Sequence, residues 1–440
     1  MAKNNTISGW GNFPVIKGKL IKVSTTNHLK EVLNRNKNII PFGNGRSYGD
    51  SALSDNMIHY NNPEASIEID EKTGVAIVSA ATQIGSLIDH ILPLGWFPPV
   101  VPGTKFVTIG GAIAADIHGK NHHVDGCFSQ HIISFELMLP NGDVIQCSRI
   151  DNSELFRATC GGMGLTGVIL NARIKMLRVQ SRFIEQISYK AQNIDELFAH
   201  FSNYDSQRYS VAWIDCTAKG MGMGRGVLIT GEFLKNGALR GYNTGNHSRL
   251  NIPFFLPSWL INPFSLKIFN TLYYHLSGFN ERKKVVVDLN RFFFPLDQIH
   301  NWNRLYGKNG FLQYQFVLPL KNSKKGIKQI LHKIASSGLG SPLAVLKLFG
   351  PQNDNYLSFP TEGYTLALDF KNQPSIFPLL DELDRIVLDL KGKIYLAKDA
   401  RMTKEHFEQT YENLQTFTSL RKEYGMRKKL KSIQSQRLSL

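Results

Sequence analysis

Cysteine and long uninterrupted apolar runs are both scarce in this chain of 440 residues. Its four cysteines, Cys127, Cys147, Cys160 and Cys216, are widely spaced and form no C-x-x-C pair, which argues against a zinc knuckle or a thioredoxin-type site. The spacing favours a reducing compartment. No run of about 18 residues is free of charge and proline, so no transmembrane helix is predicted. The polar N-terminus, MAKNNTISGWGNFP, lacks an apolar core, and no signal peptide is expected.

Negative charge is also in short supply. The chain has 51 Lys and Arg against 35 Asp and Glu, which gives a formal net charge of +16. Such an excess indicates an anionic partner, which is nucleic acid, an anionic membrane surface or a phosphorylated ligand. Hydrophobic residues make up 42% and charged residues 20%, an ordinary globular balance that excludes a wholly disordered or fibrous chain. The length predicts two or three domains.

Strand and helix signals alternate with glycine loops in the first third of the chain, which is an α+β pattern. The predicted elements are a helix capped near 24–26 with Leu29, Val32 and Leu33 as its apolar stripe, strands at 39–40, 66–70 and 75–80, a helix at 84–91 ended by Pro93, a hairpin at 132–147 turning at Asn141-Gly142, a helix begun near 151–153 and a strand at 168–176. From about 180 to 390 we expect longer strands and amphipathic helices. The basic tail, 403–440, is helical in pattern, and a charge run of this kind is ordinarily a solvated face.

One segment of the middle region, residues 252–276, is very apolar but is broken by Pro253, Pro257 and Pro263. It is either a buried irregular segment or core helix, or an exposed apolar flap that meets lipid. Its composition slightly favours the buried alternative.

The first of three glycine-rich segments is PFGNGRSYGD, from Pro41 to Asp50. Glycines let backbone N–H groups approach phosphate oxygens, and an Arg and a Ser add donors. The spacing G-x-G-x-x-x-G matches neither the dinucleotide fingerprint nor a Walker A loop. Taken alone, this segment is equally well explained as a tight structural turn.

The second segment runs from Pro102 to His123 and the third from Cys160 to Gly167. Small residues at 110–115 would let a flat ring or a pyrophosphate lie against the backbone. The histidines near 118–123 do not predict a metal site, because Gly119 opposes the helix they would need to share a face. Three such loops, each at an element boundary, indicate one large phosphate-bearing ligand that threads between them.

Long motifs extend this pattern over nearly the whole chain. They are PFGNGRSYGD, PGTKFVTIGGAIAADIHGKNHH, LFRATCGGMGLTGVI, SVAWIDC, NRFFFPLD, WNRLYGKNGFLQYQFVLP, VLKLFGP, SFPTEGYTLALDF and YLAKDARMT. Together they resemble the decaprenylphosphoryl-β-D-ribose 2′-oxidase family of vanillyl-alcohol-oxidase-type flavoproteins. The resemblance implies an α+β, two-domain PCMH-type FAD-binding fold with a substrate domain built on an antiparallel sheet. The implied units are an FAD-binding domain at 1–178, a substrate domain at 179–392 and a segment at 393–440 that returns to the first domain.

The resemblance also implies the FAD contacts. The first loop would wrap the pyrophosphate with Gly43, Asn44, Gly45, Arg46, Ser47 and Tyr48. The cradle would continue with Gly103, Thr104, Gly110, Gly111 and Ala112. The isoalloxazine would lie beside His118, Gly119, Lys120, Asn121 and His122, with Ile169 on the adenine side and Tyr395 reaching FAD from the C-terminal segment. Relatives with covalent flavin carry a histidine in the first loop; this chain has none there, so non-covalent FAD is expected.

The implied substrate pocket is lined by Gln313, Gln315, Lys347, Phe349 and Lys398. Lys398 is the expected catalytic residue, because a desolvated lysine beside the reacting hydroxyl can orient it or accept its proton. From composition alone it would be a surface lysine paired with Asp399. Gln315 is expected to hydrogen-bond the sugar, and His118 and Lys120 to hold the substrate phosphate. Ala367 stands where family members have a pocket cysteine, which removes a thiol but no catalytic group.

The reaction implied by the resemblance is FAD-dependent oxidation of the 2′-hydroxyl of a polyprenylphosphoryl-β-D-ribose. This is the first half of epimerisation to the arabinose form for cell-envelope glycans, and a short-chain dehydrogenase/reductase is the implied partner. With the basic charge and the apolar segment, it predicts peripheral membrane association on the cytoplasmic side. The alternative is a flavin oxidase of a soluble sugar, alditol or aldonolactone. A nucleic-acid-binding role rests only on charge, since no nucleic-acid motif is recognised.

Overall fold

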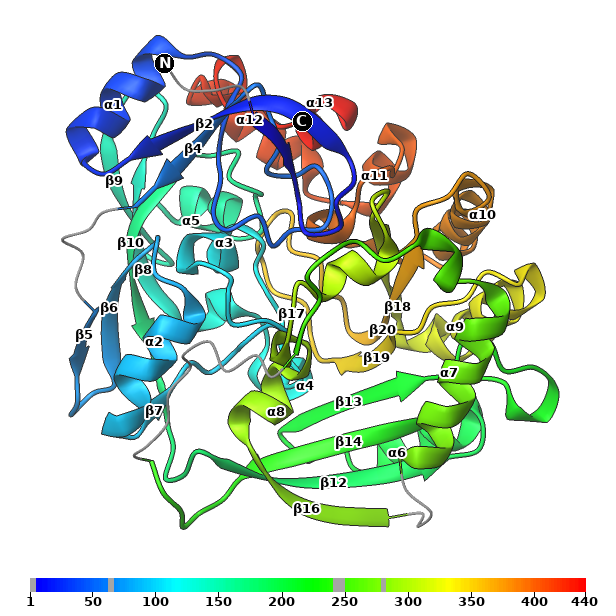
Figure 1. Ribbon diagram of the computed structural model, residues 1–440. Helices are drawn as coiled ribbons and strands as arrows, with labels where there is room; N and C mark the ends of the chain where they lie inside the picture. The colour runs from blue at the N-terminus through cyan, green and yellow to red at the C-terminus, as the bar shows by residue number, and fades with distance from the viewer. Residues whose placement is uncertain (1–4, 62–66, 240–249, 278–281) are drawn as a thin grey trace.

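The computed structural model describes residues 5–61, 67–239, 250–277 and 282–440 (Figure 1). The first sheet has the strand order β1-β2-β4-β3, built from β1 (Asn5–Ser8), β2 (Val15–Val23), β3 (Ile39–Pro41) and β4 (Asn56–Tyr60). Both β2 and β3 run parallel to β4, and α1 (Thr26–Arg35) connects them. The Thr25 side chain caps this helix, and its predicted apolar stripe is buried.

A five-stranded antiparallel sheet follows, in the order β5-β6-β10-β8-β9. Its strands are β5 (Ile67–Asp70), β6 (Val75–Ser79), β8 (Ile132–Met138), β9 (Val144–Ser148) and β10 (Val168–Lys175). The accompanying helices are α2 (Ile84–Ile91), α3 (Ile109–Ala114), α4 (His122–Asp125) and α5 (Ser153–Thr159). The predicted hairpin is confirmed, with Gly142 at a φ of +87° in its turn, where a side chain would be strained. The predicted strands and helices of this region are also confirmed.

The largest sheet has eight antiparallel strands in the order β16-β12-β14-β13-β19-β20-β18-β21. They are β12 (Phe183–Ala191), β13 (Tyr209–Ile214), β14 (Gly226–Phe233), β16 (Arg282–Asp288), β18 (Phe311–Pro319), β19 (Ala344–Phe349), β20 (Gly363–Lys371) and β21 (Lys393–Ile394). Two short pairs complete the strands: β7 (Trp96–Phe97) with β11 (Leu177–Arg178), and β15 (Leu250–Asn251) with β17 (Ile299–His300). The mixture of helices and largely antiparallel sheets matches the predicted α+β fold class. The domain boundaries 1–178, 179–392 and 393–440 stay a prediction.

Helices cover one face of the eight-stranded sheet. They are α6 (Ile194–Asn203), α9 (Leu320–Ser337) and α10 (Ile376–Asp389), which contact β12, β14, β18 and β20. Because neighbouring residues of a strand point to opposite faces, Leu346, Leu366 and Phe316 form a fully buried row under these helices. Polar residues on the same strands therefore point the other way, toward α4 and the loops of the first region.

The C-terminal helices α11 (Lys404–Thr410), α12 (Leu414–Glu423) and α13 (Ile433–Arg437) lie beside the N-terminal sheet (Figure 1). Ile39 exchanges backbone hydrogen bonds with Lys429 and Lys431. Arg421 is fully buried and donates to the carbonyls of Leu165 and Leu430. The expectation of a solvated tail is therefore only partly right: part of its basic charge fastens the C-terminus to the first region.

The prediction from composition that residues 252–276 are buried is wrong. Residues 252–276 include α7 (Pro263–Leu276), and many of their large apolar side chains are exposed. Burial fails because the helix is held by only one side, through Leu266, Asn270 and Tyr274. In the part of the chain that the structure describes, no helix is long and apolar enough to cross a membrane.

Candidate active site

The first glycine loop follows β3 and forms an open backbone cradle. The N–H groups of residues 43–47 donate to no acceptor among the described residues. Gly45 has a φ of +59°, and Asn44 Nδ2 donates to the Phe106 carbonyl at 3.0 Å. The Arg46 guanidinium lies 4.2 Å from the ring centroid of Trp10, with its Nε buried and unpaired. Successive free N–H groups beside a cation are the donor set that a pyrophosphate needs.

The second loop meets the first at Thr108, whose Oγ1 caps α3 by accepting from the Gly111 amide at 3.1 Å. A Cβ at Gly43 would lie 2.7 Å from this oxygen, and one at Gly110 would lie 3.1 Å from Ala80 Cβ. These glycines let the two loops approach closely. A Cβ at Gly103, by contrast, would meet nothing within 4 Å. The predicted cradle is thus brought together, except that close packing requires no glycine at 103.

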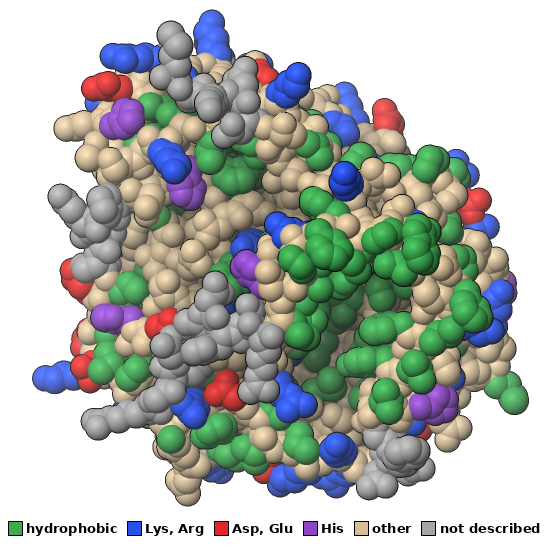
Figure 2. Space-filling view, in the orientation of Figure 1, with side chains coloured by type: hydrophobic (Ala, Val, Ile, Leu, Met, Phe, Trp, Pro, Cys, Tyr) green, Lys and Arg blue, Asp and Glu red, His purple; other side chains and the backbone are tan. Residues whose placement is uncertain are grey.

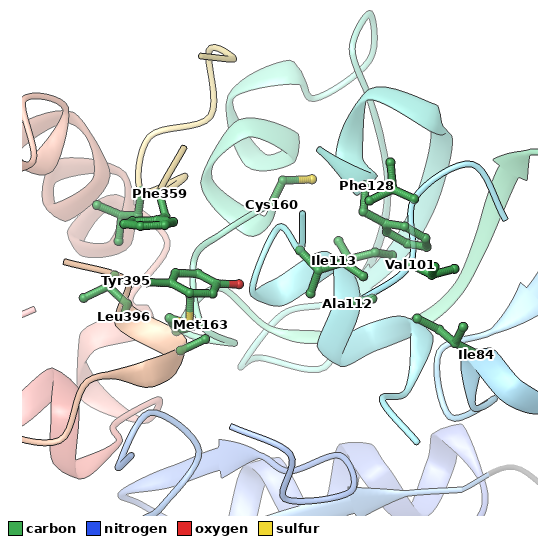
Figure 3. Packing of buried hydrophobic residues seen from close by; sticks show 14 of the residues in the cluster. Ile84, Val101, Ala112, Ile113, Phe128, Cys160, Met163, Phe359, Tyr395 and Leu396 are labelled. Atoms are coloured by element: carbon green, nitrogen blue, oxygen red, sulfur yellow. The ribbon is translucent and has the colours of Figure 1, made fainter. Parts of the chain in front are cut away.

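The third glycine loop supports α3 from beneath. The amides of Gly161 and Met163 donate to the carbonyls of Ile113 and Ala114, and Ile169 is buried in β10, on which α3 packs. Tyr395 reaches the same place from the C-terminal segment. Its hydroxyl donates to the Ala115 carbonyl at 2.9 Å and its ring stacks on Phe359 (Figure 3).

His118 is the point where the first region meets the eight-stranded sheet. Gln315 Nε2 donates to His118 Nε2 at 3.0 Å and also to Thr365 Oγ1 at 3.2 Å. The imidazole is therefore neutral with its proton on Nδ1, and that buried Nδ1 has no partner in the described part of the chain. Burial, and secondarily the positive charge of Lys347, hold the pKa of His118 well below its usual value. The site thus contains an unused neutral donor.

Two predicted contacts near His118 are already engaged by protein groups. His122 Nδ1 accepts from the Gly350 amide at 3.1 Å, and Nε2 lies 3.4 Å from Cys127 Sγ. Asn121 Nδ2 donates to the Pro99 carbonyl at 2.8 Å. The structure places both beside the site: His122 joins α4 to the loop after β19, and Asn121 joins the start of α4 to the loop after β7. Phe349, 4.7 Å from His118 between ring centroids, forms the apolar wall.

Three lysines lie close to His118 or to one another: Lys347 and Lys398 act electrostatically on His118, and Lys347 acts on Lys120. Burial lowers the pKa of Lys347 to about 8, of Lys398 to about 7 and of Lys120 to about 7. Lys120 Nζ donates to the Phe292 carbonyl. Lys398 Nζ lies 3.7 Å from the ring centroid of Tyr48. The surface pairing of Lys398 with its neighbour is wrong, because Asp399 pairs instead with Arg437 at 2.9 Å.

Asp369 is a residue that the sequence analysis missed. It lies on β20 opposite Gln313 of β18, whose Nε2 donates to its Oδ1 at 2.5 Å. Asp369 is fully buried, its Oδ2 has no hydrogen-bond partner within the described ranges, and burial raises its pKa to about 7. Its charge raises the pKa of Lys398. The available signal was the alternation of Thr365, Ala367 and Asp369, which puts all three on the face that carries Gln313 and Gln315.

The residues of the cradle fit FAD. The free N–H groups of residues 43–47 suit the pyrophosphate, and the small residues of α3 leave room for a flat ring beside the unpaired His118 Nδ1. Within the described ranges, no group of three or more His, Cys, Asp or Glu side chains is placed to hold a metal ion.

Comparison with known proteins agrees with this geometry. A family model described as an FAD binding domain matches residues 20–148. The chain is 35% identical to the decaprenylphosphoryl-β-D-ribose oxidase of Mycolicibacterium smegmatis over 432 residues, which cover 94% of this chain and 93% of that protein. An uncharacterized Streptomyces coelicolor protein is 31% identical over 76% of this chain and 94% of its own length. L-gulonolactone oxidase of Scyliorhinus torazame is 28% identical over 34% of this chain and 36% of that protein.

A flavin cradle facing a lysine-lined antiparallel sheet, with a matching FAD-domain model, defines an FAD-dependent oxidoreductase. FAD is its cofactor. The similarity over nearly the full length narrows the class further: the chain belongs to the decaprenylphosphoryl-β-D-ribose oxidase family.

Proposed function

We propose that this protein oxidises the 2′-hydroxyl of a polyprenylphosphoryl-β-D-ribose to the 2′-keto sugar. The observation that supports the proposal is a set of contacts: Gln315 bonds His118, Lys347 lies close enough to His118 to lower its pKa, and Lys398 lies on the Tyr48 ring of the first loop. These groups suit a substrate that combines a sugar hydroxyl with an anion. The full-length similarity to a decaprenylphosphoryl-β-D-ribose oxidase supports the same substrate class.

In the proposed reaction Lys398 takes the proton of the reacting hydroxyl. A pKa of about 7 leaves a large neutral fraction at neutral pH, which suits a general base. When bound, FAD accepts the hydride that leaves the carbon bearing that hydroxyl. Gln315, held by His118 and Thr365, orients the sugar, and Asp369 supplies the counter-charge once Lys398 is protonated.

The phosphate of the substrate is proposed to lie near Lys347 and His118, with Lys120 at the border of the site. Lys347 has no hydrogen-bond or ion-pair partner among the described residues, so an incoming anion offsets the cost of its burial. Lys120 is already held by the Phe292 carbonyl. It therefore contributes mainly charge.

The wider role belongs to the same proposal. A 2′-keto sugar is a substrate for a short-chain dehydrogenase/reductase, and delivery of hydride to the opposite face gives the arabinose form used in cell-envelope glycans. The lipid tail of the substrate and the net charge of +16 support peripheral association with the cytoplasmic side of the membrane. Non-covalent attachment of FAD stays a prediction, tested by release of flavin on acid precipitation.

The test compares two kinds of substrate with purified, FAD-loaded protein. Farnesylphosphoryl-β-D-ribose is expected to lose two hydrogens by mass spectrometry, whereas free pentoses, alditols and aldonolactones stay unchanged at equal concentration. Lys398→Met, loaded with FAD to the same extent, serves as the inactive control. Turnover of the free sugars or lactones alone would instead establish the soluble-sugar oxidase, and turnover of neither would contradict both.

A further inference from the structure

A concentrated apolar surface lies along residues 250–276. We call it the α7 surface and define it as the exposed apolar side chains of these residues. They are Leu250, Phe254, Phe255, Trp259, Leu260, Phe264, Ile268, Phe269, Leu272, Tyr273 and Leu276. Figure 2 shows apolar side chains gathered around a hollow in this part of the molecule. Scattered exposed apolar residues are normal, but a contiguous patch of this kind marks a site of interaction.

Polar contacts beneath the α7 surface hold it in place. Asn270, fully buried, donates to Asp215 Oδ1 and to the Ser341 carbonyl, both at 3.2 Å. Arg225 bridges Asp215 at 2.8 Å and Thr271 at 3.0 Å. Asn262 caps α7 at its N-terminus. The helix is thus anchored by one face, while Phe264, Ile268, Leu272 and Leu276 form a stripe at four-residue spacing on the outer face.

The preceding segment, residues 250–262, is likewise held by polar contacts on one side and exposes apolar side chains on the other. Arg304 donates to the carbonyls of Ile252 and Pro253, and Lys371 donates to those of Ser258 and Ile261. These bonds satisfy the backbone from below, so the side chains of Phe254 and Trp259 are left outward, with Trp259 70% exposed. Aromatic rings with a polar backbone behind them are characteristic of membrane–water interfaces.

Charge around the α7 surface selects an anionic partner. Residues 250–276 contain no Asp or Glu and carry Lys267, while Lys190 Nζ and the Arg225 guanidinium lie 4.3 Å and 4.7 Å from the ring centroid of Tyr274. Beyond this segment, the edge strand β16 begins with three exposed cations, Arg282, Lys283 and Lys284. Of these, Lys284 pairs with Glu185 at 2.7 Å. An apolar segment without carboxylates of its own and with cations near it complements an anionic lipid bilayer. A protein partner would be expected to present its own hydrogen-bonding groups to a polar rim, and this surface offers few.

The α7 surface is also continuous with the active site. Ile261 packs against a cluster of Trp302, Tyr306 and Phe311, and Phe311 contacts the Tyr48 ring at 5.4 Å between centroids. Tyr48 is the ring on which Lys398 lies. We infer that the α7 surface is a bilayer-docking surface for anionic membranes, which turns the opening beside Lys398 toward the lipid. The inference deepens the proposed function, but its test does not require oxidase activity.

The experiment is co-sedimentation of the FAD-loaded protein with vesicles of phosphatidylglycerol and phosphatidylethanolamine, and with phosphatidylcholine vesicles for comparison. The triple variant Phe264→Ser, Leu272→Ser and Leu276→Ser removes side chains that are 74%, 54% and 77% exposed, so folding should be retained. We expect strong binding of the unmodified protein to the anionic vesicles, weakened by salt, and binding of the triple variant lower by about tenfold or more. The matched control, Ile150→Ser with Met221→Ser, removes apolar side chains that are 90% and 95% exposed elsewhere and should bind normally.

A second readout follows Trp259 directly. Vesicles made with brominated lipids should quench the fluorescence of the unmodified protein more than that of Trp259→Phe. The inference is overturned if the unmodified protein stays in the supernatant, if the triple variant binds as well as it does, or if quenching is equal. It is also overturned if the triple variant only converts a dimer to a monomer, which would assign the surface to a second copy. Equal turnover of farnesylphosphoryl-β-D-ribose in detergent by both proteins would leave the proposed reaction intact in each case.

Discussion

The eight-stranded sheet has one apolar face and one face that mixes polar and apolar residues, although the same strands build both. On β18, β19 and β20 the row Phe316, Leu346 and Leu366 is fully buried under helices. One residue along each strand, Val317, Lys347 and Thr365 form the next row, on the face that looks toward the flavin cradle. Because successive side chains of a strand point to opposite faces, residues that stabilise the core and residues that line the candidate site alternate along the same strand.

The largest expected effect is a loss of kcat in a variant that alters the candidate site and leaves the core intact. Lys398→Met removes the proposed base but retains much of the side-chain volume. We expect kcat to fall by about 10²–10⁴-fold, with FAD content and melting temperature close to those of the unmodified protein. Flavin reduction by substrate in stopped flow measures the step directly. Retention of normal kcat would remove Lys398 from the mechanism.

The matching change on the structural face is Leu366→Ala. Its side chain is fully buried, so truncation leaves a cavity and lowers the free energy of unfolding by about 2–5 kcal/mol. Urea denaturation followed by circular dichroism measures this loss. The kcat per folded, FAD-loaded molecule should change little. A large fall in kcat without loss of stability would mean that the two faces are not separable.

The chemical face also depends on the cradle opposite to it. In Gly43→Ala the added Cβ would approach Thr108 Oγ1 at 2.7 Å, which forces the first two loops apart. We expect FAD affinity to fall by about tenfold, as about 1.4 kcal/mol of lost contact implies. Gly103→Ala is the matched control, since its Cβ meets nothing within 4 Å. Flavin fluorescence titration measures both; equal affinities would argue against close packing at Gly43.

The smallest expected effect is a pH shift in Asp369→Asn. Burial lowers the pKa of Lys398 to about 7, and the negative charge of Asp369 partly opposes this. Loss of that charge lowers the pKa further, so the neutral, base-competent lysine persists to lower pH. The acidic limb of kcat/KM should therefore move to lower pH by about one unit. In the unmodified protein the midpoint belongs to the Asp369–Lys398 pair jointly. A midpoint that is unchanged or higher would contradict the coupling.

Prediction from the sequence succeeded where local signals are strong. The apolar stripe of α1, the β8–β9 hairpin and the strands of the second sheet follow from period, caps and turn residues. It was only partly right for the basic tail, since nothing local shows that Arg421 is buried against Leu165. It failed for residues 252–276, because apolar composition is the same whether a segment is buried or exposed.

In the candidate site, too, some features follow from the sequence and others depend on the tertiary structure. Long motifs predict, through the family resemblance, the flavin cradle and the pocket positions of Lys398 and Gln315; the structure brings Lys398 to the Tyr48 ring and Gln315 to His118. Which groups remain available to a ligand depends on contacts between distant segments. His122 and Asn121 are occupied by Gly350 and Pro99, while Asp369 joins the site across two strands. Desolvation and charge pairing arise only when those segments meet, so the shifted pKa values of the three lysines and Asp369 are properties of the folded chain.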